Sequence, residues 1–247
     1  MNHVLAVIPV YEHHEPVVAV VEGLLAADVP VLLVDDGSSD ACRTALAELP
    51  TRYGSTRVRV LRLPANLGKG GAVMAGLREA ARLGHSHALQ IDADGQHDTS
   101  DVPRFLAASR SEPTAVVIGR PVFDDSVPKG RLYGRYATHV WVWINTLSLA
   151  IRDSMCGFRV YPLQAVVPLL DHVALGRRMD FDPEVLVRLH WRGVHFVNLD
   201  TQVRYPAGGI SHFQMFRDNV RLSWMHTRLF FGMVVRLPLL LARRWRT

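Results

Sequence analysis

The sequence predicts an α/β domain with a mostly parallel central sheet flanked by helices, followed by an amphipathic helical tail. Short apolar runs and amphipathic stretches alternate five times within about 120 residues, as they do when each strand is followed by a crossover helix. The runs are apolar nearly throughout, which is typical of strands that are covered on both faces. Beyond residue 216 the chain is apolar but interrupted by arginines, which predicts a helix with one polar side.

Each expected strand of the first half ends at a turn sequence. Residues 3–10 end at Tyr11-Glu12, residues 29–34 end at Asp35-Asp36-Gly37, and residues 88–91 end at Asp92-Ala93-Asp94. The remaining strands are expected at 58–63 and 115–118. The helices between them follow a 3.6-residue apolar spacing and are expected at residues 16–27, 41–49, 68–83 and 102–109. Ser38, Ser39 or Asp40 can cap the second helix, and glycines open the third.

After residue 123 this alternation ends. The sequence predicts a loop at 123–134, an aromatic-rich helix at 136–151, and a segment at 154–160 that leads into a helix at 163–170. A helix at 181–191 and a strand at 194–203 follow. The long tail, 217–241, has helical spacing, and we expect Pro238 to break it because proline removes a backbone hydrogen bond.

Composition excludes several classes of protein. With 247 residues, 49% hydrophobic and 21% charged, the chain is too apolar to be disordered and long enough for a large core. It has no run of about 18 apolar residues and no signal-peptide pattern, so we expect a cytoplasmic protein without a spanning helix. Two cysteines, Cys42 and Cys156, are too few for a disulfide framework, and reduced thiols are expected.

The net charge of +5 is concentrated in the tail. Six arginines and no acidic residue follow Asp218, which leaves 22 basic against 23 acidic residues in the rest of the chain. The nearly neutral body argues against a nucleic-acid partner. A basic, apolar tail predicts peripheral contact with an anionic membrane, and a packing helix in the core or in an oligomer is the alternative.

Acidic residues follow three expected strands and should meet at one edge of the sheet, because ligands of parallel sheets bind beyond the carboxyl ends of the strands. Asp92 and Asp94 can share a divalent cation or divide metal and ribose between them, and such oxygen ligands suit Mg²⁺ or Mn²⁺. Asp35 or Asp36 can accept hydrogen bonds from a nucleobase or a ribose. The alternative for both pairs is a turn whose aspartates cap the next helix.

Other charged residues could serve phosphate or proton transfer. Lys69 lies in a glycine-rich helix start that could attract phosphate, although it matches neither a P-loop nor a dinucleotide fingerprint. Arg120 and Arg131 flank the loop in the middle of the chain and suit bidentate phosphate binding, or are solvated surface charges. Asp180 or Asp182 could accept a proton from an acceptor hydroxyl, or simply favour the start of a helix.

Five motifs together resemble glycosyltransferase family 2, in the order found there. They are Ile8-Pro9-Val10-Tyr11-Glu12, Asp35-Asp36-Gly37-Ser38, Asn66-Leu67-Gly68-Lys69-Gly70, Asp92-Ala93-Asp94-Gly95-Gln96-His97 and Cys156-Gly157-Phe158-Arg159. The chain is most similar to the branch of dolichyl- or polyprenyl-phosphate sugar transferases. The resemblance implies a GT-A, Rossmann-like fold, an inverting transfer from a nucleotide-diphosphate sugar, and a divalent metal.

The resemblance also implies roles for single residues. It implies that Pro9, Tyr11 and Glu12 line the nucleotide site and that Asp35 contacts the base. It assigns Asp92 to ribose or metal and Asp94 to the metal, with Gln96 beside it. It assigns Arg120 to the phosphate of a lipid acceptor, with Arg131 as a further candidate.

Two departures from the family pattern bear on the acceptor. Gly209-Ile210-Ser211-His212 stands where the phosphate-acceptor branch carries a lysine, so polyprenyl phosphate and a lipid or aryl hydroxyl both stay open as acceptors. The QxxRW element of processive polysaccharide synthases is absent, which argues against polymer synthesis.

These observations predict a glycosyltransferase on the inner face of a membrane. Residues 1–215 form the catalytic domain, with a nucleotide-sugar half at 1–120 and an acceptor half at 121–215, and residues 216–247 form a membrane-associating tail. A homo-oligomer stays open. A non-catalytic nucleotide-sugar-binding protein and a nucleotidyltransferase are the alternative functions.

Overall fold

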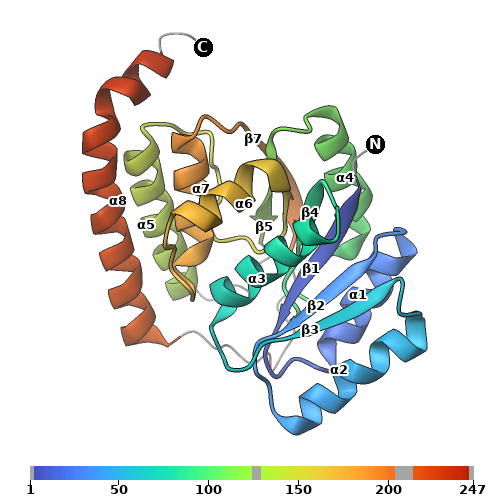
Figure 1. Cartoon of the computed structure of the whole chain (residues 1–247). Coiled ribbons are helices and arrows are strands. Elements are labelled where there is room, and N and C mark those ends of the chain that lie inside the picture. The colour runs from blue at the N-terminus through green and yellow to red at the C-terminus, as the bar shows by residue number, and fades with distance from the viewer. Residues whose placement is uncertain (1–2, 124–128, 204–213, 245–247) are drawn as a thin grey trace.

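The computed structural model describes residues 3–123, 129–203 and 214–244 (Figure 1). The strands are β1 Val4–Val10, β2 Val31–Asp35, β3 Val58–Arg62, β4 His87–Gln90, β5 Val116–Val122, β6 Arg159–Pro162 and β7 Phe196–Gln202. The helices are α1 Pro16–Ala26, α2 Asp40–Tyr53, α3 Lys69–Arg82, α4 Val102–Ser111, α5 Lys129–Thr146, α6 Leu163–His172, α7 Phe181–Trp191 and α8 Met215–Arg244, with a short 3-10 turn at Thr99–Asp101.

The seven strands form one sheet in the order β3-β2-β1-β4-β6-β5-β7. Every strand except β6 runs in the same direction, which confirms the mostly parallel sheet that the sequence predicts. Because β6 is antiparallel to β4 and β5, its first residue lies at the edge where the other strands end. That residue, Arg159, pairs with Gln90, the last residue of β4.

The segment 154–160 leads to the expected helix, which begins at Leu163, but it does so through a strand that was not predicted, Arg159–Pro162, which is short and fully buried in the interior of the sheet. The expected break at Pro238 is wrong, because helix α8 continues through that residue. The carbonyl that loses its partner belongs to Val234, whose side chain is 47% exposed, so water can solvate that side of the helix.

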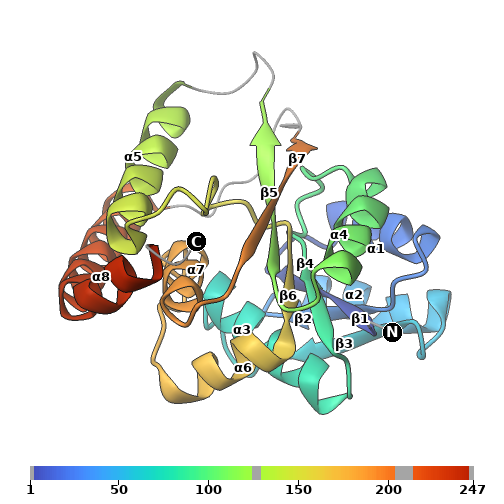
Figure 2. The same cartoon turned by 90° about the horizontal axis from the view of Figure 1, so that it is seen from above.

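Helices cover both faces of the sheet. Alternate residues of β1 point to opposite faces, with Leu5 and Val7 in one core and Ala6 and Ile8 in the other. The core around Ala6 and Ile8 is covered by α1, α2 and α4, and the opposite core by α3, α6 and α7. Helices α5 and α8 pack against each other and on the outer side of α7 (Figure 2).

Candidate active site

The edge formed by the carboxyl ends of β1, β2 and β4 gathers the acidic residues that the sequence singles out. Asp35 is the last residue of β2 and Asp36 follows it, while Asp92 and Asp94 follow β4. The strands β1, β2 and β4 are neighbours in parallel register, so these carboxylates share one edge. The reversed strand β6 adds Arg159 to the same edge, and the start of α7 adds Asp182, whose carbonyl accepts a hydrogen bond from Arg159.

The centre of the site is an ammonium group held between two carboxylates. Lys69 Nζ lies 2.8 Å from Asp92 Oδ1, 2.9 Å from Asp92 Oδ2 and 3.0 Å from Asp182 Oδ2. Burial disfavours the charge on Lys69, but Asp182 and Asp92 outweigh it and raise the pKa of the ammonium. Burial likewise opposes the ionised form of Asp92, yet Lys69 holds the pKa of that carboxyl below its usual value. Lys69 and Asp92 are therefore both charged at neutral pH.

Arg159 receives no individual role from the sequence, yet the structure places it in this cluster, against Asp182. Its side chain is fully buried, and its Nη1 donates to the Asp182 carbonyl and to Tyr161 Oη, both at 2.9 Å, and lies 3.2 Å from Asp182 Oδ1. Gln90 Nε2 donates to the same Oδ1 at 3.2 Å. The motif Cys156-Gly157-Phe158-Arg159 is the feature of the sequence that points to this arginine, because the arginine is its last residue.

Asp94 is suited to hold a divalent cation with Asp92. Asp94 Oδ1 accepts a local hydrogen bond from the N–H of Gln96 at 3.1 Å. Burial, and then the charge of Asp92, raise the pKa of Asp94, and a cation between the two carboxylates would relieve both effects. Next to them lies His97, with Nε2 4.0 Å from Asp92 Oδ2, and burial lowers the pKa of this imidazole.

Two carboxylates suit Mg²⁺ or Mn²⁺, which can take their other ligands from water and from a substrate. They would not suit a metal whose ligands all come from the protein. Within residues 3–123, 129–203 and 214–244, no group of three or more His, Cys, Asp or Glu side chains is placed to hold a metal. Two carboxylates are nevertheless enough for an ion that completes its shell with water and with the phosphates of a substrate. Asp92 and Asp94 would supply those two ligands.

The predicted nucleotide residues lie at the ends of β1 and β2. Asp35 is buried, accepts the N–H of Ser38 at 2.9 Å and forms an ion pair with Arg62. Glu12 accepts the N–H of Ser39 at 2.6 Å and its hydroxyl at 2.8 Å, and these hydrogen bonds hold the pKa of Glu12 below its usual value. Pro9 is in β1, and Tyr11 follows the strand with a side chain that is 36% exposed.

The glycine-rich start of α3 is largely occupied by protein contacts. Asp36 accepts the N–H groups of Leu67 at 2.7 Å and Gly68 at 2.8 Å, so both of its oxygens are engaged. The N–H of Gly71 donates to the carbonyl of Arg177 at 2.9 Å. The segment therefore positions the Lys69 side chain, and these three amides are already bonded within the chain.

Of the remaining predicted residues, Arg120 and Asp180 make contacts away from this cluster in the described part of the chain. Arg120 in β5 forms a bidentate ion pair with Asp200 in β7, at 2.5 and 2.6 Å. Asp180 Oδ1 accepts the N–H of Arg178 at 3.0 Å. Arg131 belongs to α5, but its side chain lies outside the described residues, as does the segment Gly209-Ile210-Ser211-His212.

Comparisons with known proteins identify the family of this chain. The sequence model of Glycosyl transferase family 2 matches residues 5–165. Dolichyl-phosphate beta-glucosyltransferase of Mus musculus is 31% identical over 166 residues, which cover 63% of this chain and 50% of that protein. Undecaprenyl-phosphate mannosyltransferase of Micrococcus luteus is 32% identical over 172 residues, covering 64% of this chain and 65% of that protein. The chain thus spans about half the length of the dolichyl-phosphate relatives that it matches.

Solved structures share the fold. Glucosyl-3-phosphoglycerate synthase of Mycobacterium tuberculosis, in complex with Mn²⁺ and UDP-glucose, has a TM-score of 0.60 at 16% identity and covers 95% of this chain and 79% of its own. A mannosyltransferase of Pyrobaculum calidifontis, in complex with GDP-mannose and Mn²⁺, has a TM-score of 0.62 at 13% identity, covering 95% of this chain and 64% of its own. At such identities the likeness concerns the fold alone, and it confirms the expected GT-A architecture. The match of the family model over residues 5–165, more than half of the chain, shows that the chain belongs to glycosyl transferase family 2.

Proposed function

We propose that this chain is an inverting glycosyltransferase that moves a sugar from a nucleotide-diphosphate sugar to a lipid phosphate, on the inner face of a membrane. Family membership supports the transferase activity, and relatives named for dolichyl phosphate and undecaprenyl phosphate support a polyprenyl-phosphate acceptor. Neighbours bound to Mn²⁺ and a nucleotide sugar support a divalent cation at Asp92 and Asp94.

The surroundings of Asp182 support a phosphate acceptor over a hydroxyl acceptor. A hydroxyl needs a carboxylate that can take its proton. Both oxygens of Asp182 are engaged, Oδ2 by Lys69 at 3.0 Å and Oδ1 by Arg159 and Gln90, each at 3.2 Å. Neither oxygen is open to take a proton from a hydroxyl, so we assign Asp182 to holding Lys69. A phosphate acceptor is already anionic and needs no base.

The proposed reaction is a single displacement at the anomeric carbon. An oxygen of the acceptor phosphate forms the new bond to that carbon, and the bond to the diphosphate oxygen breaks on the opposite face. The bonding electron pair leaves with the nucleoside diphosphate, and no proton has to move. When bound, the metal would neutralise negative charge on the diphosphate.

The chain's own residues orient the reactants in this proposal. Asp35 and Glu12 hold the turn that would receive the nucleotide, and Lys69 places a positive charge beside Asp92. Arg120 and Arg131 keep their predicted role toward the acceptor phosphate, which for Arg120 requires release from Asp200. The division into a catalytic part, residues 1–215, and a tail, 216–247, likewise stays a prediction.

The acceptor class can be tested directly. The purified chain, with Mn²⁺ and either labelled UDP-glucose or labelled GDP-mannose, is offered undecaprenyl phosphate or the corresponding alcohol, undecaprenol. We expect labelled lipid from the phosphate and none from the alcohol, and we expect Asp182→Asn to retain measurable transfer to the phosphate. Transfer to undecaprenol that Asp182→Asn abolishes would identify Asp182 as a base. Stabilisation by a nucleotide sugar without any transfer would favour the non-catalytic alternative.

A further inference from the structure

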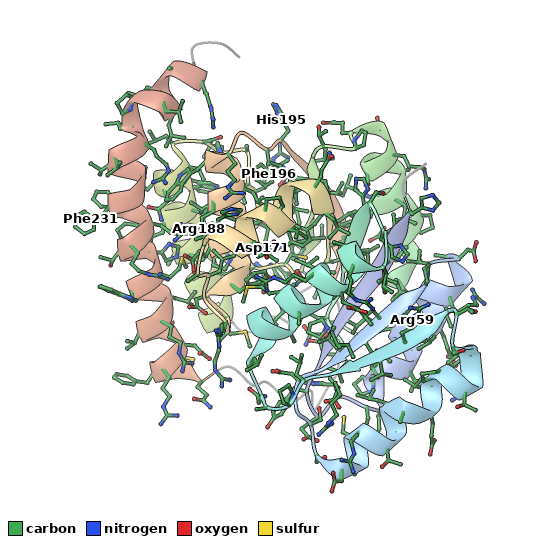
Figure 3. All side chains as sticks on the ribbon, viewed as in Figure 1. Arg59, Asp171, Arg188, His195, Phe196 and Phe231 are labelled. Atoms are coloured by element: carbon green, nitrogen blue, oxygen red, sulfur yellow. The ribbon has the colours of Figure 1, made fainter. Side chains whose placement is uncertain are left out.

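Helix α8 has one side in the protein core and one apolar side that no described residue covers. Its core side carries Leu222, Met225 and Leu229, which are buried. The opposite side exposes large apolar residues, with Phe231 65% and Val235 80% exposed. Figure 3 shows Phe231 pointing away from the body of the domain. The exposed side of α8 therefore has the character of an interaction surface.

Helix α5 extends this surface. Trp141 of α5 and Phe230 of α8, which are 43% and 37% exposed, meet edge to face with ring centroids 6.4 Å apart. Tyr136 and Val140 of α5 are also exposed, at 56% and 48%. The two helices thus expose apolar residues on both sides of the Trp141–Phe230 contact. We call this set the α5–α8 face and define it by its exposed members: Tyr136, Val140, Trp141, Phe230, Phe231 and Val235.

Helix α8 is fixed to α7 along its length by three arginines. Arg228 Nη2 lies 3.4 Å from Glu184 Oε2. The guanidinium of Arg236 lies over the ring of Trp191, 4.7 Å from its centroid, and Arg243 Nη1 donates to the Trp191 carbonyl at 2.8 Å. By length and composition α8 could cross a membrane, with a mean hydropathy of 1.3 in its most apolar part. Crossing would break these contacts, uncover the core side and carry Arg228 and Arg236 into hydrocarbon.

We infer that the α5–α8 face docks flat on an anionic membrane, with α8 lying in the plane of the headgroups and not across the bilayer. The inference deepens the proposed function, on which it rests for the lipid acceptor. It also extends the docking surface beyond the tail, because α5 contributes half of the face.

Charge selects a membrane over a second copy of the chain as the occupant. Six arginines and no acidic residue follow Asp218. Two copies meeting through this face would bring together two helices that carry arginines and no acidic residue after Asp218, whereas anionic headgroups complement them. An apolar stripe bordered by arginine is the pattern of a helix that lies in the membrane interface.

The face is also tied to the catalytic edge. Arg135 of α5 forms a bidentate ion pair with Asp153, both bonds being 2.7 Å long. Asp153 Oδ1 in turn accepts the N–H groups of Met155 and Cys156, which lead into the segment beside Asp92. Docking through α5 would therefore set the distance between the bilayer and the site.

Vesicle binding tests the face. The full chain is sedimented with phosphatidylcholine vesicles with and without phosphatidylglycerol. We expect binding that requires phosphatidylglycerol and falls about tenfold or more in Phe231→Ser/Val235→Ser and in Tyr136→Ser/Val140→Ser. Phe231→Leu/Val235→Leu is the matched control and should bind like the parent. Unchanged binding of both serine variants would overturn the inference, and so would a dimer without lipid that the same substitutions dissociate.

Cysteine labelling separates a helix in the plane from one that spans. Met215→Cys and Leu241→Cys place a thiol near each end of α8 at exposed positions, while Cys42 and Cys156 are buried. With protein bound from outside, a membrane-impermeant maleimide should label both ends. Protection of one end alone would overturn the in-plane arrangement.

One activity measurement keeps this inference distinct from the proposed function. Transfer to a short polyprenyl phosphate in detergent does not need docking, so the serine variants should retain it. Loss of vesicle binding with retained transfer supports the docking face. Binding without any transfer in the parent chain would refute the proposed function and leave the docking face standing.

Discussion

The backbone of Gly157 lies directly against the carboxylate of Asp92. A Cβ at Gly157 would lie 2.1 Å from Asp92 Oδ2 and 2.3 Å from its Cγ, which is closer than any side chain allows. The glycine of the Cys156-Gly157-Phe158-Arg159 motif is therefore required by the space that Asp92 occupies. The approach arises because β6 is reversed, which brings the residues before it to the end of β4.

Gly157→Ala should displace Asp92 from Lys69 and weaken binding of a nucleotide sugar with Mn²⁺ by tenfold or more, at a cost in stability of about 1–3 kcal/mol. Isothermal titration with UDP-glucose and GDP-mannose, together with thermal unfolding, measures both effects. Gly134→Ala is the matched control, because a Cβ there meets nothing within 4 Å and the position is helical. Parental affinity in Gly157→Ala would show that Asp92 does not contribute to the donor site.

The sequence predicts the parallel part of the sheet and its acidic edge well. Alternation of apolar runs with helices places Asp92 and Asp94 after a strand, and parallel strands bring Asp35 to the same edge. Each of these features, an apolar run, an amphipathic helix or an aspartate after a strand, can be recognised within a short stretch of sequence. They suffice because crossover helices fix the direction of successive parallel strands.

The rest depends on contacts between distant segments. A four-residue strand such as β6 carries too little periodicity to reveal that it is reversed, so the place of Arg159 at the edge was missed. The same holds for Asp182, whose proximity to Lys69 depends on how α7 docks. The low helix propensity of proline predicts a break in α8 at Pro238, but propensity reflects only the local sequence. The packing of α8 on α5 and α7, which the sequence does not reveal, keeps the helix continuous.

Lys69→Met should destabilise the chain by about 3 kcal/mol, because it leaves Asp92 and Asp182 without their shared buried cation. Chemical denaturation measures the change. The double variant Lys69→Met/Asp92→Asn should lose less than the sum of the single changes, since it removes charge on both sides of the contact.

Arg78→Met is the control for Lys69→Met, because it removes the cation of an exposed ion pair. Arg78 and Asp171 are also paired at 3.0 Å, but their side chains are 44% and 50% exposed. Removing an exposed pair typically costs about 0–1 kcal/mol. Equal losses in Lys69→Met and Arg78→Met would contradict the central position that we give to the Lys69 ammonium.

Asp94→Asn should abolish the increase in nucleotide affinity that Mn²⁺ produces, because an amide cannot replace the charge of the second carboxylate. Thermal shift with UDP or GDP, with and without Mn²⁺, measures this without turnover. Burial and Asp92 raise the pKa of Asp94, so the change removes an unfavourable charge and the metal-free chain should be no less stable. Asp40→Asn, at a side chain that is 84% exposed, is the control. A parental Mn²⁺ effect in Asp94→Asn would remove this residue from the metal site.

Acidification should loosen the α5–α8 contact through His226. This residue of α8 is 5% exposed, stacks on Trp141 with centroids 6.0 Å apart, and lies 3.4 Å from Asn145. Burial lowers its pKa from 6.5 to about 4, so the folded chain keeps it neutral while the unfolded chain binds a proton. Stability should therefore fall between about pH 6.5 and pH 4, by up to about 3 kcal/mol from this group. His226→Leu should flatten that part of the curve of unfolding free energy against pH. If the slope of unfolding free energy against pH is the same in His226→Leu and the parent chain, this histidine can be protonated in the folded chain without a loss of stability.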